Sequence, residues 1–382
     1  AVLKDAAEKI GVEVELEKVP EGADGDNLVK TRFATNDLPD LLFYYAGLNT
    51  QHGIGKPADI LVSQDDQPWI ANFDTNNWKG VMDAEGLFYG APLGGISVGV
   101  VLYNKKVFES LNLKVPTTME EFWAVSEAIK KGGKTPVFLS GKDSWTLQLP
   151  ALISMARPSQ IDFLKKLYAG EATYHDFTIQ KKGLTFLKNV IDKGYVNKDF
   201  LSDTYDNAQK ALAEGSAGMY VMATWVMPDI STKFPDQVND IGAFIMPFDG
   251  TDSDVGGVFP PNAVYVVKGK NQEAAQRFLN YFASLEAQNL YFSVEGGIPA
   301  MKGVTQAKVT PAEADAQKMV DAGRIASFAY NLGPGYPIYA AGDFAAFSQD
   351  VAAGGKTPDE VMEAQQKEFV KNAKAANDPN FK

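Results

Sequence analysis

The chain has 382 residues, a length at which a single hydrophobic core usually gives way to two domains. Its net charge of −12, from 36 basic and 48 acidic side chains, would repel a polyanion, so we expect no nucleic-acid partner. The sequence has no cysteine and only two histidines, which excludes disulfides, thiolate zinc sites and cysteine nucleophiles and leaves little for general-base chemistry.

The N-terminal part predicts helices that alternate with strands. A helix is already under way at residues 1–10 without a cap before it, so we expect an upstream segment to have been cleaved or removed. Residues 12–17 alternate apolar and acidic side chains, the period of a half-buried strand. Residues 26–36 then predict a helix and residues 39–44 a buried strand. This order favours an α/β fold around a largely parallel sheet.

The rest of the chain continues this alternation. Two helices are predicted from capping boxes, in which Thr117 pairs with Glu120 and Thr357 pairs with Glu360, and another helix is predicted over 272–291. Further strands are predicted at two places within 87–104 and at 137–139, 217–222, 241–247 and 263–267. No apolar run approaches the roughly 20 residues of a membrane-spanning helix. No single linker divides the chain, so we expect two domains joined by several short crossings.

A series of short motifs along the whole chain resembles the family of extracellular solute-binding proteins that includes maltose-binding protein. In the family's order, the motifs are Pro39-Asp40, Phe88-Tyr89-Gly90-Ala91-Pro92, Leu102-Tyr103-Asn104-Lys105, Pro116-Thr117-Thr118, Gly141-Lys142-Asp143-Ser144-Trp145, Gly218-Met219 with Trp225, Gly256-Gly257, Lys270-Asn271-Gln272-Glu273-Ala274-Ala275, Gly296-Gly297-Ile298-Pro299 and Gly354-Gly355-Lys356-Thr357. No single motif is specific. Their common order over the chain is what carries the resemblance.

The resemblance implies an α/β, two-lobe periplasmic-binding-protein fold with a hinge between the lobes and a ligand cleft. The expected N-terminal lobe consists of residues 1–105 and 254–303, and the expected C-terminal lobe of residues 106–253 and 304–382. The family's first strand is absent from this sequence, so a list of binding residues drawn from it is incomplete.

The implied function is extracytoplasmic capture of a mono- or oligosaccharide, in particular an oligosaccharide, and its delivery to the transmembrane permease of an ABC transporter. We expect a monomer in the periplasm or, as a lipoprotein, on the surface of a Gram-positive bacterium. It would meet the membrane only through a removed lipid anchor or the permease. We expect no enzyme activity, no cofactor and no metal. The alternative is a sugar-active enzyme, a hydrolase or lyase, that uses carboxylates in the cleft.

A sugar site needs flat aromatic platforms and short, fixed hydrogen-bonding groups. Asp143 and Trp145 share a turn after a strand, and Trp225 follows the strand at 217–222. The resemblance implies that the indoles stack on sugar while the carboxylate accepts from its hydroxyls; the alternative is a core tryptophan beside a helix-capping aspartate. Further candidate contacts are Tyr44, Ser97, Gly257, Phe259, Tyr336 and Asp343. The other tryptophans, Trp69, Trp78 and Trp123, are expected to be structural.

Two motifs suggest other chemistry but lack a required part. Gly95-Ile96-Ser97-Val98-Gly99 matches the G-x-S-x-G pattern of a serine hydrolase, yet a strand follows the serine where that chemistry needs a helix. The acidic loop at 249–254 lacks the glutamate that position 12 of an EF-hand loop requires. We therefore expect neither a serine nucleophile nor a calcium loop.

Overall fold

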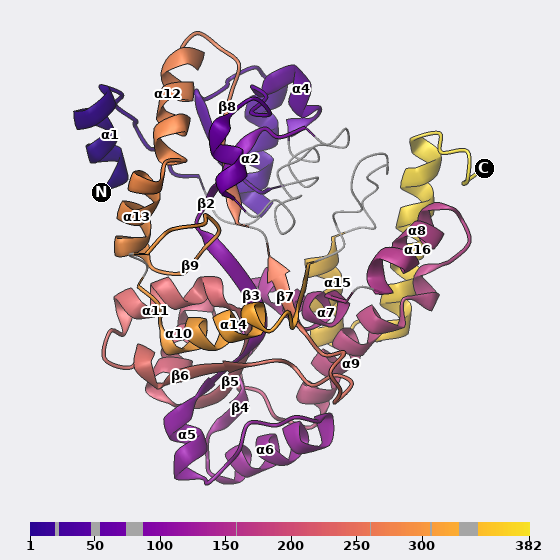
Figure 1. The fold of residues 1–382 in the computed structure, drawn as a ribbon. Coiled ribbons are helices and arrows are strands. Elements are labelled where there is room, and N and C mark those ends of the chain that lie inside the picture. Colours follow the sequence, from indigo (N-terminus) through magenta and orange to yellow (C-terminus); the bar gives the residue numbers. More distant parts are fainter. Residues whose placement is uncertain are drawn as a thin grey trace. The chain divides into compact units, whose positions relative to one another are not determined.

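The computed structural model describes residues 1–19, 23–46, 54–73, 87–157, 159–259, 261–305, 308–327 and 343–382. Their contacts divide the chain into two compact units, whose elements are labelled in Figure 1. The described part of unit 1 lies in Ala1–Ser97 and Pro260–Val309, and that of unit 2 in Val98–Phe259, Thr310–Leu332 and Ile338–Lys382. Each unit is discontinuous in sequence; the lobe boundaries expected near 105, 253 and 303 stay a prediction.

Unit 1 is built on a three-stranded antiparallel sheet in which β8 lies between β1 and β2. The strands are β1 Leu41–Tyr44, β2 Gly90–Leu93 and β8 Asn262–Val266, and β9 Ile298–Pro299 pairs with the start of β3 Gly95–Asn104. The helices are α1 Val2–Ile10, α2 Ala23–Ala34, α4 Pro57–Ile60, the 3₁₀ helix η1 Pro68–Asn72, α12 Gln272–Phe282 and α13 Leu285–Glu295.

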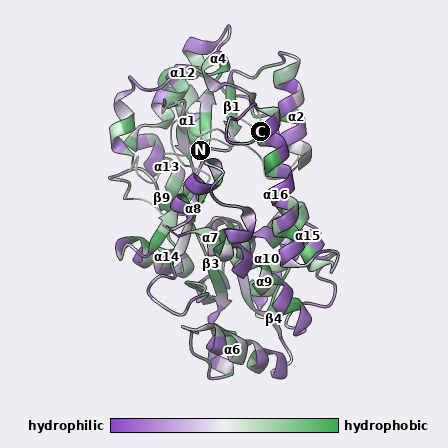
Figure 2. Ribbon diagram, turned by 90° about the vertical axis from the view of Figure 1, so that its right-hand side faces the viewer, coloured by the Kyte–Doolittle hydropathy of each residue, from purple (hydrophilic) through white to green (hydrophobic). Residues whose placement is uncertain are grey.

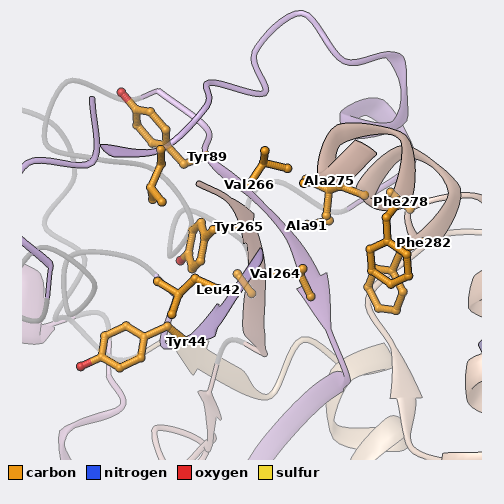
Figure 3. Packing of buried hydrophobic residues seen from close by; sticks show 14 of the residues in the cluster. Leu42, Tyr44, Tyr89, Ala91, Val264, Tyr265, Val266, Ala275, Phe278 and Phe282 are labelled. Atoms are coloured by element: carbon orange, nitrogen blue, oxygen red, sulfur yellow. The ribbon is translucent and has the colours of Figure 1, made fainter. Parts of the chain in front are cut away.

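Helix α12 packs against this sheet and completes the core of unit 1. Its Phe278 and Phe282 lie four residues apart on one helical face, and both belong to the buried cluster drawn in Figure 3. The single helix predicted over 272–291 is wrong. Ala283 ends α12, and Ser284 begins α13 by accepting a hydrogen bond from the N–H of Ala287 at 3.2 Å.

Two strand predictions in unit 1 need correction. Residues 12–17 form no strand and pair with no other described segment, and Leu16 is 70% exposed. Alternation gives a segment two faces, but a strand also needs a neighbouring edge that shares its backbone hydrogen bonds. The predicted strand at 39–44 forms over Leu41–Tyr44 with only one face in the core, because Leu42 and Tyr44 are buried and Phe43 is exposed.

Unit 2 contains a sheet of order β10–β7–β3–β5–β4, with β6 pairing with the end of β3. The strands besides β3 are β4 Thr135–Val137, β5 Ala217–Ala223, β6 Ile241–Phe244, β7 Gly256–Phe259 and β10 Ile325–Ser327. The α-helices are α5 Lys105–Ser110, α6 Met119–Lys131, α7 Leu149–Met155, α8 Ser159–Tyr168, α9 Thr178–Asp192, α10 Tyr205–Glu214, α11 Met227–Lys233, α14 Pro311–Asp321, α15 Phe344–Ala352 and α16 Pro358–Ala375. The 3₁₀ helices are η3 Ser144–Gln148, η4 Tyr174–Asp176, η5 Thr224–Val226 and η6 Val238–Asp240.

The largely parallel sheet predicted from the sequence is wrong. Strand β8 is antiparallel to β1 and β2, and β3 is antiparallel to β5, β6 and β9; β4 with β5 and β7 with β10 are parallel. The prediction assumed that each strand pairs with the next one through a helix. Sheet neighbours here come from distant segments, and local alternation carries no information about that pairing.

The predicted helix starts are present, one of them in a shifted register. Thr357 caps α16 and forms the predicted capping box with Glu360. For α6 the cap is Thr118 and not Thr117, because Thr118 accepts from the N–H of Glu121 while the Glu121 carboxylate accepts from Thr117. Figure 2 shows hydrophilic and hydrophobic residues mixed along both helices, as expected for helices with one buried side. None of the described helices is long and apolar enough to cross a membrane.

Candidate functional site

Four aromatic rings of unit 2 form a continuous series. Trp145 lies 5.0 Å from Tyr205 and 6.3 Å from Trp225, measured between ring centroids. Trp225 packs edge-on against Phe259 at 4.7 Å. All four residues are half-buried, so each keeps part of its surface accessible. These four residues are called the aromatic cluster below, and three of them were predicted from the sequence as sugar contacts.

The turn that carries Trp145 is fixed from both ends by hydrogen bonds. The backbone carbonyl of Asp143 accepts from the N–H of Thr146 at 2.9 Å, which begins η3. The Asp143 carboxylate accepts from the backbone N–H of Tyr205 at 2.6 Å and so holds the first turn of α10 beside Trp145. One carboxylate oxygen of Asp143 is therefore engaged at the start of α10, although the side chain that caps this helix is that of Thr204. The ring of Trp145 is only half-buried and does not belong to the core.

A buried hydroxyl network lies beneath this turn. The Ser140 hydroxyl is 3.0 Å from that of Thr146 and 2.9 Å from that of Tyr220 on β5. Burial raises the pKa of Tyr220, so the phenol stays protonated. Because a buried polar group without a partner is costly, these three side chains fix η3 on the sheet and thereby the position of Trp145.

The ring of Phe259 is placed by packing over β3, and the ring of Trp225 packs against Phe259. Trp225 lies on η5, which continues from β5 without a break. Phe259 ends β7, and its ring lies over Gly99: a Cβ atom at Gly99 would be 2.9 Å from Phe259 Cε2 and 2.7 Å from Ile153 Cγ1. The missing side chain of Gly99 therefore makes the space that Phe259 and Ile153 occupy.

The predicted glycine contact lies in the strand β7. Gly257 is buried and pairs with Ala326 of β10. The sequence predicts Gly257, but not Gly256, as a candidate ligand contact. Gly256 has another explanation, because a Cβ atom there would be 2.5 Å from Val98 Cγ1. A ligand contact by Gly257 stays a prediction.

Ser97 is half-buried within β3, and the strand continues beyond it as expected. The first glycine of its G-x-S-x-G match, Gly95, is explained by packing, since a Cβ atom there would be 2.5 Å from the carbonyl oxygen of Ile298. The sharp strand-to-helix turn of a serine nucleophile is therefore absent from this segment. A sugar contact by Ser97 stays a prediction.

Tyr44, the last residue of β1, and Tyr45, which follows it, belong to unit 1. Tyr44 is the buried residue of the two, and its hydroxyl donates to Asp26 at 3.2 Å. Burial, together with the Asp26 carboxylate, raises the pKa of Tyr44. Tyr45 is 41% exposed, so its ring is more accessible than that of Tyr44. A ligand contact by Tyr44 stays a prediction.

Residues 1–320 match the family described as bacterial extracellular solute-binding protein. The chain belongs to this family. It is 27% identical over 316 residues to the multiple sugar-binding protein of Streptococcus mutans. The aligned region covers 81% of this chain and 73% of that relative. Matches to two uncharacterised ABC transporter extracellular-binding proteins of Pyrococcus horikoshii span only 47% and 50% of those relatives.

Solved structures of other solute-binding proteins share the two-domain fold. A structure described in work on xylan utilisation by Caldanaerobius polysaccharolyticus has a TM-score of 0.80 and 22% identity, and covers 96% of this chain and 94% of that chain. A sugar transporter of Bacillus licheniformis in complex with stachyose has a TM-score of 0.74 and 20% identity, with coverage of 96% and 94%. The predicted fold class is thereby confirmed, and the extracellular family makes this an extracytoplasmic protein.

Two candidate ligand contacts of this solute-binding protein follow β10 in the sequence. Asp343 caps α15, where its carboxylate accepts from the N–H of Ala346 at 3.1 Å. Helix α15 packs against η3, the segment of Trp145, so Asp343 begins a helix that supports the aromatic cluster. Tyr336 lies outside the described residues. Ligand contacts by Asp343 and Tyr336 stay predictions.

Two of the tryptophans expected to be structural are described. Trp69 is buried, packs edge-on against Phe73 and donates from its indole N–H to Asn280 at 3.1 Å. Trp123 stacks on Phe186 with 5.6 Å between centroids. Trp78 lies outside the described residues.

The acidic loop at 249–254 folds around one of its own carboxylates. Asp254 accepts from the backbone N–H groups of Asp249, Gly250 and Thr251 at 3.0, 2.7 and 3.3 Å. In the parts of the chain that the structure describes, no group of three or more histidine, aspartate or glutamate side chains is arranged to hold a metal ion.

Tyr205 is the member of the aromatic cluster that the sequence did not indicate. It is brought to Trp145 by the hydrogen bond from its N–H to Asp143, which joins segments 62 residues apart. The only local signal is an aromatic residue directly after a helix cap, which is too common to be predictive.

Proposed function

We propose that this solute-binding protein captures a carbohydrate, in particular an oligosaccharide, outside the cytoplasm and delivers it to the permease of an ABC transporter. The observation that carries the proposal is the aromatic cluster with the Asp143 carboxylate beside it. Half-buried rings offer apolar faces to the C–H faces of a sugar, and a carboxylate accepts hydrogen bonds from its hydroxyls.

The tilt of the rings supports a ligand of more than one sugar unit. Trp145 is inclined by 59° to Tyr205 and by 47° to Trp225, and Trp225 by 80° to Phe259. The cluster is therefore a set of differently oriented platforms and not one flat wall. Successive units of a bent saccharide can each use a different platform, whereas a monosaccharide would use only part of the cluster.

The names of similar proteins support the same ligand class. The relative from Streptococcus mutans is a multiple sugar-binding protein, and the similar structure from Bacillus licheniformis holds stachyose. We further propose that the protein is a monomer without enzyme activity, that it reaches the membrane through a lipid anchor or the permease, and that its lobes close on the sugar.

A thermal-shift screen with product analysis tests this proposal. The panel contains stachyose, xylan-derived oligosaccharides, their monosaccharides, a peptide mixture and a polyamine. A ligand at about 100 times its Kd adds about 2.7 kcal/mol to native stability, which raises the midpoint measurably. We expect a shift with an oligosaccharide that is recovered intact. A cleaved sugar would favour the hydrolase or lyase alternative, and a shift only with peptide or polyamine would refute the carbohydrate ligand.

A further inference from the structure

A buried ion pair joins two segments of unit 2. One segment follows Trp145 in the chain, and the other precedes Phe259. Arg157 and Asp254 are 6% and 3% exposed, and a terminal guanidinium nitrogen donates to the carboxylate at 2.6 Å. Arg157 is the second residue after the end of α7 at Met155, and α7 itself continues η3, which carries Trp145, without a break. Asp254 lies two residues before the start of β7 at Gly256, and β7 ends at Phe259. The pair therefore connects the two sides of the aromatic cluster.

Asp254 is fixed by more than its arginine partner. Its carboxylate gathers the backbone N–H groups of the acidic loop, and its own backbone carbonyl accepts from the guanidinium of Arg324 at 3.0 Å. The carbonyl of Arg324 in turn accepts from the N–H of Gly256, the first residue of β7, at 3.0 Å. The hydrogen bonds of Asp254 therefore fix the direction in which the acidic loop at 249–254 continues into β7.

Arg157 is fixed on its own segment as well. Its guanidinium donates to the carbonyl of Ser154 at 3.0 Å and to the carboxylate of Asp249 at 3.2 Å. Burial raises the pKa of Asp249, but Lys182 and Arg157 lower it by more, so this pKa lies below its ordinary value and the carboxylate stays ionised. The two carboxylates therefore balance the two positive charges: Asp254 pairs with Arg157, and Asp249 pairs with Arg157 and Lys182.

We infer that Arg157 and Asp254 are positioning residues that set the placement of Trp145 relative to Phe259, an inference that rests on the proposed sugar site. Stability alone is a weak reason for such a pair, because apolar residues of similar volume often give an equally stable core. The planar guanidinium of an arginine has a fixed hydrogen-bond geometry, so it can hold two segments at a defined distance and angle. Helix α7 packs against β7, and Ile153 of α7 shares the space over Gly99 with Phe259. A shift of α7 would therefore move this side of the cluster.

The aromatic cluster contains a spectroscopic reporter that needs no sugar. The indoles of Trp145 and Trp225 are 6.3 Å apart between centroids, close enough for their electronic transitions to couple and give an exciton couplet in the circular dichroism spectrum. Trp145→Phe identifies this couplet by removing it. A change in the couplet without a change in helix content reports a changed ring geometry in a folded protein.

Arg157→Lys is the main test, because it keeps the charge and removes the forked geometry. We expect a folded protein whose couplet differs from wild type, and about tenfold weaker binding of the panel saccharide that gives the largest wild-type shift, a loss of about 1.4 kcal/mol. Lys182→Met is the matched control. It removes the other, half-exposed partner of Asp249, and we expect a wild-type couplet and affinity.

Asp254→Asn is the second variant, because it keeps an oxygen for the loop N–H groups and removes the charge that faces Arg157. Phe369→Leu controls for stability, since it loses packing against Tyr168 and Tyr174 without touching the ion pair. A wild-type couplet and affinity in folded Arg157→Lys or Asp254→Asn would overturn the inference, as would equal changes in Phe369→Leu. If wild type binds no panel saccharide, the proposed function fails, and the couplet alone decides the positioning role.

Discussion

The hydroxyl of Thr224 accepts a hydrogen bond from the backbone N–H of Val98 at 3.1 Å, and both residues are buried. The contact ties η5 to β3 directly before Trp225. Thr224 thus stabilises the packing against the sheet, and the adjacent Trp225 contributes its ring to the aromatic cluster. Substitutions at these two adjacent positions should therefore affect different properties.

Thr224→Val should lower the free energy of unfolding by about 1–3 kcal/mol, because the buried N–H of Val98 would lose its acceptor while the volume of the side chain is kept. Urea denaturation measures the change. Thr224→Ser retains the hydroxyl and should lose much less. A loss in Thr224→Ser together with no loss in Thr224→Val would show that the methyl group, and not the hydrogen bond, stabilises this position.

Trp225→Ala should weaken saccharide binding by about 1–3 kcal/mol, because it removes a large aromatic contact, and Trp145→Ala should do the same. Isothermal titration calorimetry with the best saccharide of the panel measures the loss. Trp123→Ala is the control, since that ring stacks on Phe186 outside the aromatic cluster and its loss should lower stability without changing affinity. Wild-type affinity in both cluster variants would mean that the site lies elsewhere.

Much of this site could be predicted because its residues follow recognisable strand ends. Trp145 and Trp225 each come after a buried apolar run, and the resemblance placed both in a binding loop. Tyr205 could not be predicted, because only the hydrogen bond to Asp143 brings α10 to that turn. The sequence likewise indicated an acidic loop, but not that one of its carboxylates would be enclosed by Arg157.

The fold shows the same limit. Helix positions such as Thr357 carry local signals, since a cap and its partner lie within one turn. Strand pairing carries none. The strand β8 that pairs with both β1 and β2 is distant from each in sequence, and an alternating segment such as 12–17 forms no strand where no described edge pairs with it.

Gly99→Ala should reduce both stability and affinity. The added Cβ atom would be 2.7 Å from Ile153 and 2.9 Å from Phe259, so both side chains must move, at a cost of about 1–3 kcal/mol in unfolding free energy. Displacement of Phe259 disturbs the contact with Trp225, which calorimetry reports as weaker saccharide binding. Gly269→Ala is the control, because a Cβ atom there meets no atom within 4 Å. Unchanged affinity in Gly99→Ala would mean that the position of Phe259 does not matter for saccharide binding.

Two capping-box glutamates should respond to pH with opposite signs. Glu313 at the start of α14 is 2% exposed, and burial raises its pKa above the ordinary 4.5 although Thr310 donates to it twice at 2.8 Å. Glu360 at the start of α16 makes equivalent hydrogen bonds to Thr357 at the surface, and these lower its pKa below 4.5.

A raised pKa in the folded state means that the contribution of Glu313 to stability is present below the unfolded pKa and is lost as pH rises through the folded pKa. Glu313→Gln keeps an acceptor oxygen and cannot ionise, so its unfolding free energy relative to wild type should increase as pH rises above about 4.5. Glu360 has the opposite sign: its contribution is present above the unfolded pKa and is lost as pH falls through the folded pKa, so Glu360→Gln should become less stable relative to wild type as pH rises toward about 4.5. Urea denaturation at a series of pH values measures both differences. A pH-independent difference for Glu313→Gln would mean that the hydrogen bonds from Thr310 fully offset the burial of the carboxylate.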